Sequence, residues 1–211
     1  GGSYYAPTGV GVLSSEILDD PYHPFTADIG HGDFLQHPWL QDTITDTHLD
    51  RGHGAENENR YGRLFALLAR SVADKQGQLP AFAIGAEEGA FLAVDAAGSA
   101  RAFGNGSAPG SDIYLLQSNG AVPETIAPGT PLIWDRDGVA VKAYRLAGSP
   151  AGSGSFDLGD WLGAAGGEWL NWYTDGGYGG FNYAGGGCDD CGGATPPHRL
   201  ILRDGFEAVS R

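Results

Sequence analysis

Residues 42–74 read "DTITDTHLDRGHGAENENRYGRLFALLARSVAD", and this stretch decides the expected fold class. Its first part alternates Ile44 with threonines, which is typical of a strand that enters the core. Its last part, from Arg60 on, carries apolar residues at helical spacing, which form one stripe of an amphipathic helix. The residues of that stripe are Leu64, Leu67, Leu68 and Val72. The stretch therefore predicts a strand, a loop and a helix.

Further strands are expected on the C-terminal side of this helix. The segment "PAFAIGAEEGAFLAVDAAGSARAFG" (80–104) predicts two strands that flank "GAEEG", followed by a turn at Ala97–Gly98. The segments "SDIYLLQ" (111–117), "PLIWD" (131–135) and "VAVKAYRL" (139–146) are apolar enough for strands. One long helix with strands on both sides favours an α/β fold, with a trailing antiparallel β region.

The composition divides the chain into three parts. Residues 1–147 hold the strand and helix signals and are expected to form the C-terminal part of an α/β domain. Residues 148–187 begin with the flexible connector "GSPAGSGS" and continue as a stretch rich in glycine, tryptophan and tyrosine, which we expect to be a β extension. Residues 188–211 form a cysteine-containing C-terminal tail.

Charge and hydropathy exclude several classes of partner. The 211 residues are 41% hydrophobic, but no apolar run is long enough to cross a membrane. The formal net charge of −14 repels phosphate backbones and anionic lipids, so we expect no nucleic-acid or membrane partner. The same charge attracts ligands that carry arginine. The absence of Met indicates a fragment or a processed product.

The two cysteines, Cys188 and Cys191, lie in "GGGCDDCGG". They could form a local disulfide or supply half of a zinc site. A four-thiolate zinc site needs a second pair, which the sequence lacks. We therefore favour the disulfide, which indicates an oxidising compartment and a secreted or periplasmic protein.

The segment "DTHLDRGH" (46–53) permits a metal hydrolase. Its spacing is that of a histidine–aspartate metal motif at a strand end, whose four positions hold Asp46, His48, Asp50 and Arg51. Two nitrogen ligands of such a motif are missing, and an arginine beside zinc would repel it. We therefore expect no metal site and no cofactor, and keep the metal hydrolase as an alternative.

Acid–base chemistry is the second interpretation of the same segment. A histidine at the C-terminal end of a strand, here His48, lies where open α/β sheets form their sites. Its imidazole can act as the general base for a hydroxyl nucleophile if a carboxylate holds its other nitrogen. Glu87 and Glu88 follow the next predicted strand and point in opposite directions, so only one of them can face His48. The alternative is that His48 caps a loop and both glutamates are solvated.

Several segments, in order, resemble the cyanophycinase and aspartyl-dipeptidase family of serine peptidases. They are "VLSSEILDDPYHP", "TDTHLDR…RYGRLFALLARSVAD", "AIGAEEGAFLAVDAAGSARAFG", "DIYLLQ" and "APGTPLIW…VAVKAYRL", and they span roughly residues 8–175. The resemblance implies a Rossmann-like α/β sheet related to class I amidotransferases. It also implies a Ser–His–Glu triad with the serine on a Gly-x-Ser-x-Gly elbow.

The resemblance assigns roles to individual residues. His48 matches the general base and Glu88 the acidic member of the triad. Glu87 matches the preceding acidic position, which we place at the substrate. Arg60 and Arg63 match arginines of the family's helix-start motif, where guanidinium–carboxylate pairing would hold acidic groups of the substrate.

The sequence departs from the family in two ways. It contains no Gly-x-Ser-x-Gly elbow, so the nucleophile is expected just before Gly1, on an N-terminal fragment that would be a partner of this chain; Ser3, Ser14 and Ser15 are weaker substitutes. The loop after His48 is also expanded. The resemblance implies hydrolysis of amide bonds next to aspartyl groups, in peptides that carry aspartyl and arginyl side chains. The alternative class is a non-catalytic binding or structural protein on a degenerate peptidase scaffold.

Overall fold

The computed structural model describes residues 11–26, 37–40, 43–50, 58–74, 81–106, 110–118 and 120–183. The helical elements in these ranges are α1 (Ser14–Asp19), the short 3-10 helix η1 (Pro38–Leu40) and α2 (Tyr61–Asp74). The strands are β1 (Thr43–Thr47), β2 (Phe82–Ala86), β3 (Ala90–Val94), β4 (Ser99–Gly104), β5 (Asp112–Ser118), β6 (Thr125–Ala127), β7 (Thr130–Ile133), β8 (Val141–Ala147), β9 (Ser153–Asp157), β10 (Ala164–Ala165), β11 (Glu168–Thr174) and β12 (Phe181–Asn182).

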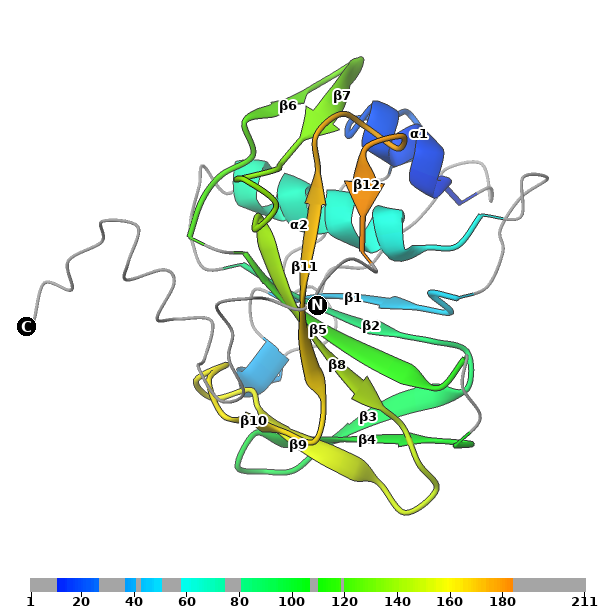
Figure 1. Cartoon of the computed structure of the whole chain (residues 1–211), viewed down its shortest axis with the longest axis vertical. Helices are drawn as coiled ribbons and strands as arrows, with labels where there is room; N and C mark the ends of the chain where they lie inside the picture. The colour runs from blue at the N-terminus through cyan, green and yellow to red at the C-terminus, as the bar shows by residue number, and fades with distance from the viewer. Residues whose placement is uncertain are drawn as a thin grey trace, which may run out of the picture.

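The strands form two main sheets (Figure 1). The large sheet has six strands in the order β1-β2-β5-β8-β11-β12, and the small sheet has four in the order β10-β9-β4-β3. Strands β6 and β7 make a separate hairpin. Strands β1 and β2 are parallel and are connected through α2, whereas the other strand pairs of the described residues are antiparallel.

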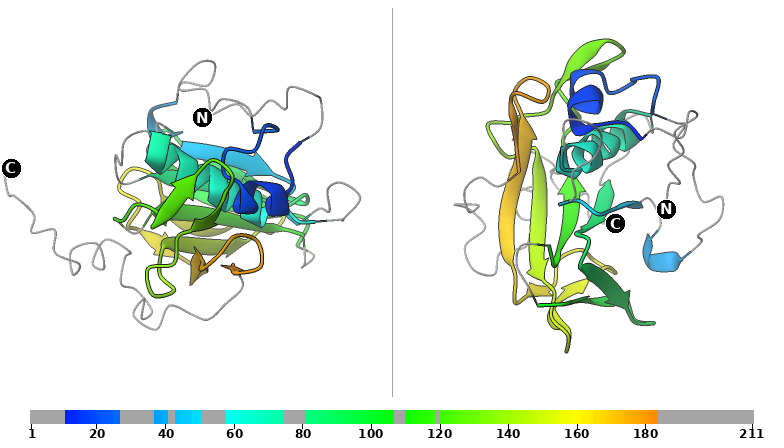
Figure 2. Two further views of the ribbon diagram at one scale, coloured as in Figure 1. Left: turned by 90° about the horizontal axis from the view of Figure 1, so that it is seen from above. Right: turned by 90° about the vertical axis from the view of Figure 1, so that its right-hand side faces the viewer.

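The large sheet is covered on both faces. Helix α2 lies against one face, with α1 packed on α2 and β7, and the small sheet packs near the other face (Figure 2). Strand β5 contributes side chains to two hydrophobic cores, one on each face of the large sheet. Tyr114 and Leu116 join the core under α2, while Ile113 and Leu115 join the core shared with the small sheet. Alternate side chains of a strand point to opposite faces, so a continuously apolar strand is required here.

The expected Rossmann-like α/β fold is wrong. The described residues are 42% strand and 16% helix, with two α-helices and several sheets, instead of helices that flank a parallel sheet. The helix of residues 60–74 and the strand before it were identified correctly. The error arose because a strand buried on both faces has the same apolar sequence whether a helix or a second sheet covers it. Here the second cover is the antiparallel sheet of β3, β4, β9 and β10.

The region expected as a β extension takes part in both sheets. Strand β9 pairs with β4 of the small sheet, and β11 pairs with β8 of the large sheet. The buried Trp172 brings its ring from β11 into the core under α2. Residues 148–183 are thus packed together with the strands of the first 147 residues. Cys188 and Cys191 lie outside the described residues, as does the tail expected at 188–211.

Gly85 on β2 allows α2 to approach the sheet closely. A Cβ at this position would lie 2.3 Å from Leu49 Cδ1 and 2.6 Å from Leu64 Cδ2, and both leucines are completely buried. We expect Gly85→Ala to lower the free energy of unfolding by about 1–3 kcal/mol, because an extra methyl must displace packed side chains.

Urea unfolding measures this loss, and Gly176→Ala is the matched control. No atom lies within 4 Å of the Cβ position at Gly176, so the control should stay within about 0.5 kcal/mol of the wild type. Equal stabilities of the two variants would contradict the close approach of α2 to β2.

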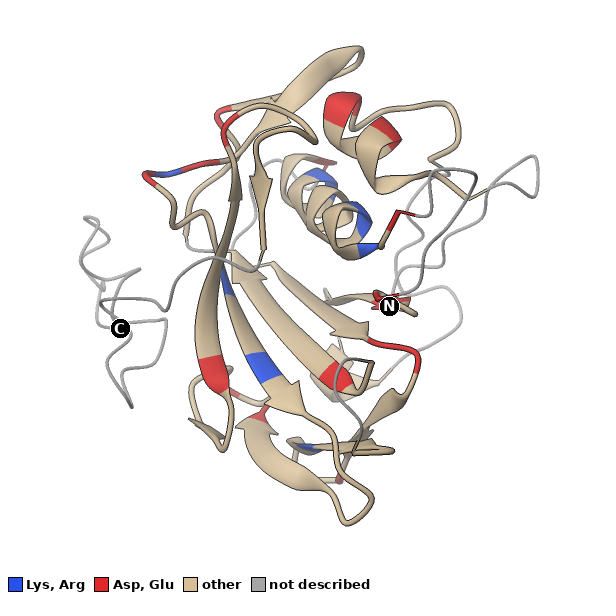
Figure 3. Ribbon diagram, turned by 45° about the vertical axis from the view of Figure 1, so that its right-hand side comes forward, with Lys and Arg blue, Asp and Glu red and all other residues tan. Residues whose placement is uncertain are grey.

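No helix among the described residues is long and apolar enough to cross a membrane. The acidic residues of the described chain are distributed over α1, several loops and the ends of strands (Figure 3).

Candidate active site

His48 directly follows β1 and has an unusual backbone conformation. Its φ of 55° lies in the left-handed region, which costs a non-glycine residue about 1–2 kcal/mol. The next residue is fixed to the neighbouring strand, because Leu49 donates its N–H to the carbonyl of Ala86 at 3.1 Å. Left-handed non-glycine residues are found at active sites but also elsewhere, and Trp161 of this chain is another. The conformation alone therefore does not identify a site.

Glu88 lies next to His48 because the two parallel strands end together. Thr47 of β1 is in register with Ala86 of β2. His48 Nδ1 and Glu88 Oε1 are 3.8 Å apart, and their side chains are 44% and 46% exposed. At this distance the two atoms do not form a hydrogen bond; hydrogen bonds between catalytic groups are often long before substrate binds and shorten in the complex. The carboxylate faces Nδ1, which leaves Nε2 to act on another group.

Arg60 holds the main chain on both sides of His48. Its guanidinium Nη1 donates to the carbonyl of Thr47 at 3.2 Å, and its backbone N–H donates to the carbonyl of Leu49 at 2.7 Å. The expected role of Arg60 in substrate binding stays a prediction. The structure adds that the guanidinium of Arg60 contacts Thr47, the residue that precedes His48.

Arg63, the second arginine of the helix start, is bound to another part of the protein. Its Nε and Nη2 donate to the two carboxylate oxygens of Asp46 at 2.8 and 2.7 Å. The side chains are only 7% and 12% exposed. Such a two-pronged pair fixes α2 against β1. The observed contacts give Arg63 a structural role, and its expected role at the substrate stays a prediction.

Glu87 points away from Glu88 into the protein, as expected for neighbouring residues at a strand end. It is 4% exposed. Tyr61 donates its hydroxyl to Oε1 at 2.5 Å. Burial, followed by this bond to Glu87, raises the pKa of Tyr61 above its ordinary value, so the phenol remains a donor. The expectation that Glu87 contacts substrate stays a prediction; in this structure its carboxylate is buried and accepts from Tyr61.

Asp112, at the start of β5, is an acidic residue of this region that sequence reasoning missed. Its side chain is 14% exposed and lies 3.8 Å from Arg145 Nε, while Arg145 also pairs with Glu168. Burial, and then the nearby charge of Glu87, raise the pKa of Asp112. A strand-start aspartate has no sequence signal of its own, since its neighbours come from other strands.

The raised pKa of Asp112 predicts a pH effect on stability. A carboxyl group whose pKa is higher in the folded state stabilises the protein below its ordinary value of 3.8, and this stabilisation is lost as pH rises through the folded-state pKa. We therefore expect Asp112→Asn to be more stabilising, or less destabilising, at neutral pH than at pH about 4. Urea unfolding of both proteins at both pH values measures this difference, and an equal effect at both would contradict it.

Other candidate groups do not assemble in the described residues. No cluster of three or more His, Cys, Asp or Glu side chains there is arranged to hold a metal ion. Asp46 is paired with Arg63, and Asp50 Oδ1 accepts the Glu88 N–H at 2.8 Å. Arg51, His31 and His53 lie outside the described residues. Ser14, a possible substitute nucleophile, is buried, and its hydroxyl donates to the carbonyl of Asn59 at 2.6 Å.

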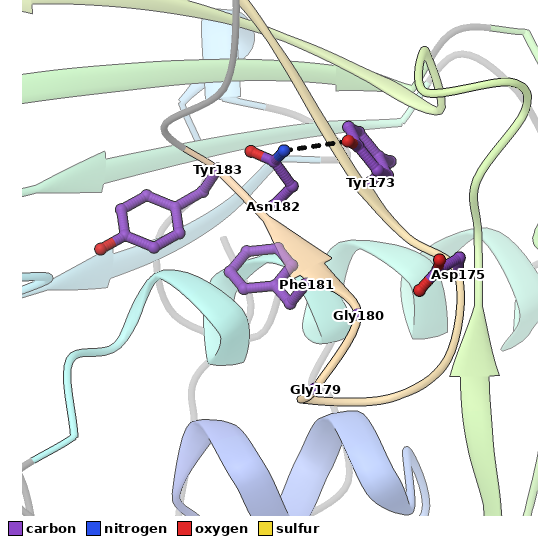
Figure 4. Close-up of a pocket in the computed structure, with 7 residues that line it drawn as sticks. All are labelled: Tyr173, Asp175, Gly179, Gly180, Phe181, Asn182 and Tyr183. Atoms are coloured by element: carbon purple, nitrogen blue, oxygen red, sulfur yellow. Dashed lines mark hydrogen bonds between the residues drawn. The ribbon is translucent and has the colours of Figure 1, made fainter.

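A separate pocket lies on the hairpin of β11 and β12 (Figure 4). Its volume is about 410 Å³. Its lining consists of aromatic, polar and glycine residues, namely Tyr173, Asp175, Gly179, Gly180, Phe181, Asn182 and Tyr183. Asn182 donates its amide to the Tyr173 hydroxyl at 2.9 Å. Neither His48 nor Glu88 lines this pocket, so it is distinct from the strand-end pair.

Comparison with known proteins does not assign the chain to a family. No protein-family model matches the sequence, and neither a curated protein nor a solved structure matches it. The candidate site thus rests on the geometry of its own residues.

Proposed function

We propose that the chain carries the base and the orienting carboxylate of a serine hydrolase that cleaves amide bonds next to aspartyl groups. His48 takes the proton of a serine hydroxyl on Nε2, and Glu88 holds Nδ1 in the matching orientation. The serine lies outside the described residues. The observation that carries the proposal is the 3.8 Å approach of Nδ1 and Oε1 from the ends of two parallel strands.

Three further features support this function. The backbone at His48 is held in a strained conformation by Arg60, and strain of this kind persists only where the surroundings determine it. Both members of the pair are nearly half exposed, so a substrate has access to them. The net charge of −14 favours the approach of peptides with arginine side chains.

Hydrolysis assays on the full-length protein test the proposal. The substrates are a polymer of β-aspartyl-arginine units, α-aspartyl dipeptides and, as controls, the matching seryl dipeptides. We expect release of amino groups from the aspartyl substrates and not from the controls. Cleavage of none of them, or equal cleavage of both sets, would contradict the proposed specificity.

A second candidate function is a non-catalytic binding protein, and the pocket on the β11–β12 hairpin favours it. Aromatic rings beside an amide and a carboxylate form a surface that can stack on a ligand and hydrogen-bond to it. This candidate predicts that binding of a ligand is lost in Tyr173→Ala and unchanged in His48→Ala. If the chain is a hydrolase, turnover is instead lost in His48→Ala and unchanged in Tyr173→Ala.

A further inference from the structure

Glu87 accepts hydrogen bonds from three different parts of the chain. Its Oε1 accepts from the hydroxyls of Tyr61 at 2.5 Å and Tyr114 at 3.5 Å. Its Oε2 accepts from the backbone N–H groups of Gly110 at 3.0 Å and Asp112 at 2.8 Å. These donors come from the start of α2, from β5 and from the residues just before β5. A buried carboxylate with four donors is held in one position.

The turn that carries Glu88 is fixed through the same residue. The N–H of Glu87 donates to the carbonyl of Asp112 at 3.0 Å, and its carbonyl accepts from Ala90 at 3.1 Å. Glu88, in turn, donates its N–H to Asp50 Oδ1 at 2.8 Å. The position of the Glu88 side chain therefore depends on a turn whose first residue is anchored inside the protein.

The connection to His48 passes through the start of α2. Tyr61, which donates to Glu87, directly follows Arg60. Arg60 in turn holds the carbonyls of Thr47 and Leu49, the residues on either side of His48. The buried carboxylate is thus linked to both members of the exposed pair: to Glu88 through its own turn, and to His48 through the first residues of α2.

We propose that Glu87 is a positioning residue that sets the relative placement of His48 and Glu88 from inside the protein. Its importance for turnover rests on the proposed function, but the placement itself is a property of the protein without substrate. A Gln side chain replaces it only in part, because its NH₂ group must either face the N–H donors of Gly110 and Asp112 or reverse the hydrogen bond that Tyr61 now donates.

The tautomer of the His48 ring reports this placement. A carboxylate facing Nδ1 favours the neutral tautomer that carries its proton on Nδ1, whereas an isolated imidazole prefers the proton on Nε2. The two tautomers have different ¹⁵N chemical shifts, so histidine-labelled full-length protein at about pH 9 can be measured directly by NMR. A residue that only stabilises the fold would not change the tautomer of a protein that remains folded.

We expect the wild type to hold the His48 proton on Nδ1 and Glu88→Gln to lose this preference. In Glu87→Gln the population of the Nδ1–H tautomer should fall by at least about threefold, to the level of Glu88→Gln. The control Glu124→Gln removes an exposed carboxylate that pairs with Arg136, and it should leave the tautomer unchanged. An unchanged tautomer in folded Glu87→Gln would overturn the proposal.

Tyr61→Phe decides the question if Glu87→Gln does not fold. This variant keeps the carboxylate and removes its shortest hydrogen bond, so a partial loss of the Nδ1–H tautomer is expected and no change would overturn the proposal. Because no substrate is present, failure of this prediction is distinct from failure of the hydrolase proposal. Absence of amide hydrolysis with an Nδ1–H tautomer that depends on Glu87 would reject the hydrolase alone.

Discussion

His48→Ala should lower kcat/KM for hydrolysis of an aspartyl dipeptide by about 10²–10⁴-fold, the usual contribution of a general base. The variant removes the ring that lies 3.8 Å from Glu88 and leaves the strand pairing of β1 and β2 intact. Most of the loss should appear in kcat, because the base acts on the reacting proton and not on substrate binding. Steady-state kinetics of the full-length protein measure both constants.

The matched control is His23→Ala. His23 accepts the Phe25 N–H on its Nδ1 and packs edge-on against the Phe25 ring, and it has no contact with the strand-end pair. The control should keep its turnover. If His23→Ala and His48→Ala retain equal activity, His48 is not the base.

Arg63→Met should lower the free energy of unfolding by about 3–5 kcal/mol, the usual cost of breaking a buried ion pair by removing one partner. The substitution keeps most of the side-chain volume but leaves the largely buried carboxylate of Asp46 without its cation. Adding Asp46→Asn should recover much of the loss, because the unpaired charge is then absent. Urea unfolding of the two single variants and the double variant measures each step.

Arg136→Met is the control for this ion pair. The pair of Arg136 and Glu124 is 38% and 34% exposed, so its loss should cost no more than about 1 kcal/mol. A loss in Arg63→Met that is no larger than in Arg136→Met would show that Asp46 does not need its cation. Arg63 would then again be a candidate for holding the substrate.

Local elements could be predicted from the sequence because their signals are local. The apolar stripe that includes Leu64 and Leu68 predicted α2, and both side chains are completely buried under it. The turn at Gly98 was also predicted, and its φ of 90° explains the glycine.

The fold class could not be predicted in the same way, because it depends on pairings between distant segments. Strand β9 pairs with β4 across more than forty residues, at Ser99 with Asp157 for example. The glycine-rich stretch after residue 148 has no clear period, so nothing in it indicates a second sheet. The apolar segment around Leu115 suited a parallel sheet equally well.

The candidate site also combines features that local sequence signals indicate with features that depend on distant segments. His48 and Glu88 could be placed at neighbouring strand ends from the order of the elements. The roles of Arg63 and Glu87 could not, because their partners are set by packing. Arg63 pairs with Asp46 of the adjacent strand, and Glu87 accepts a hydrogen bond from Tyr61 at the start of the helix. The side chains of Arg63 and Glu87 are thus paired within the protein, which residue type alone does not indicate.

Labelling with a fluorophosphonate tests most directly whether His48 and Glu88 activate a serine. The reagent is applied to the full-length protein, and the modified residue is identified by mass spectrometry of its peptides. We expect one labelled serine, whose rate of labelling falls by at least about 10²-fold in His48→Ala. Absence of a labelled serine, or an equal rate in His48→Ala, would contradict it.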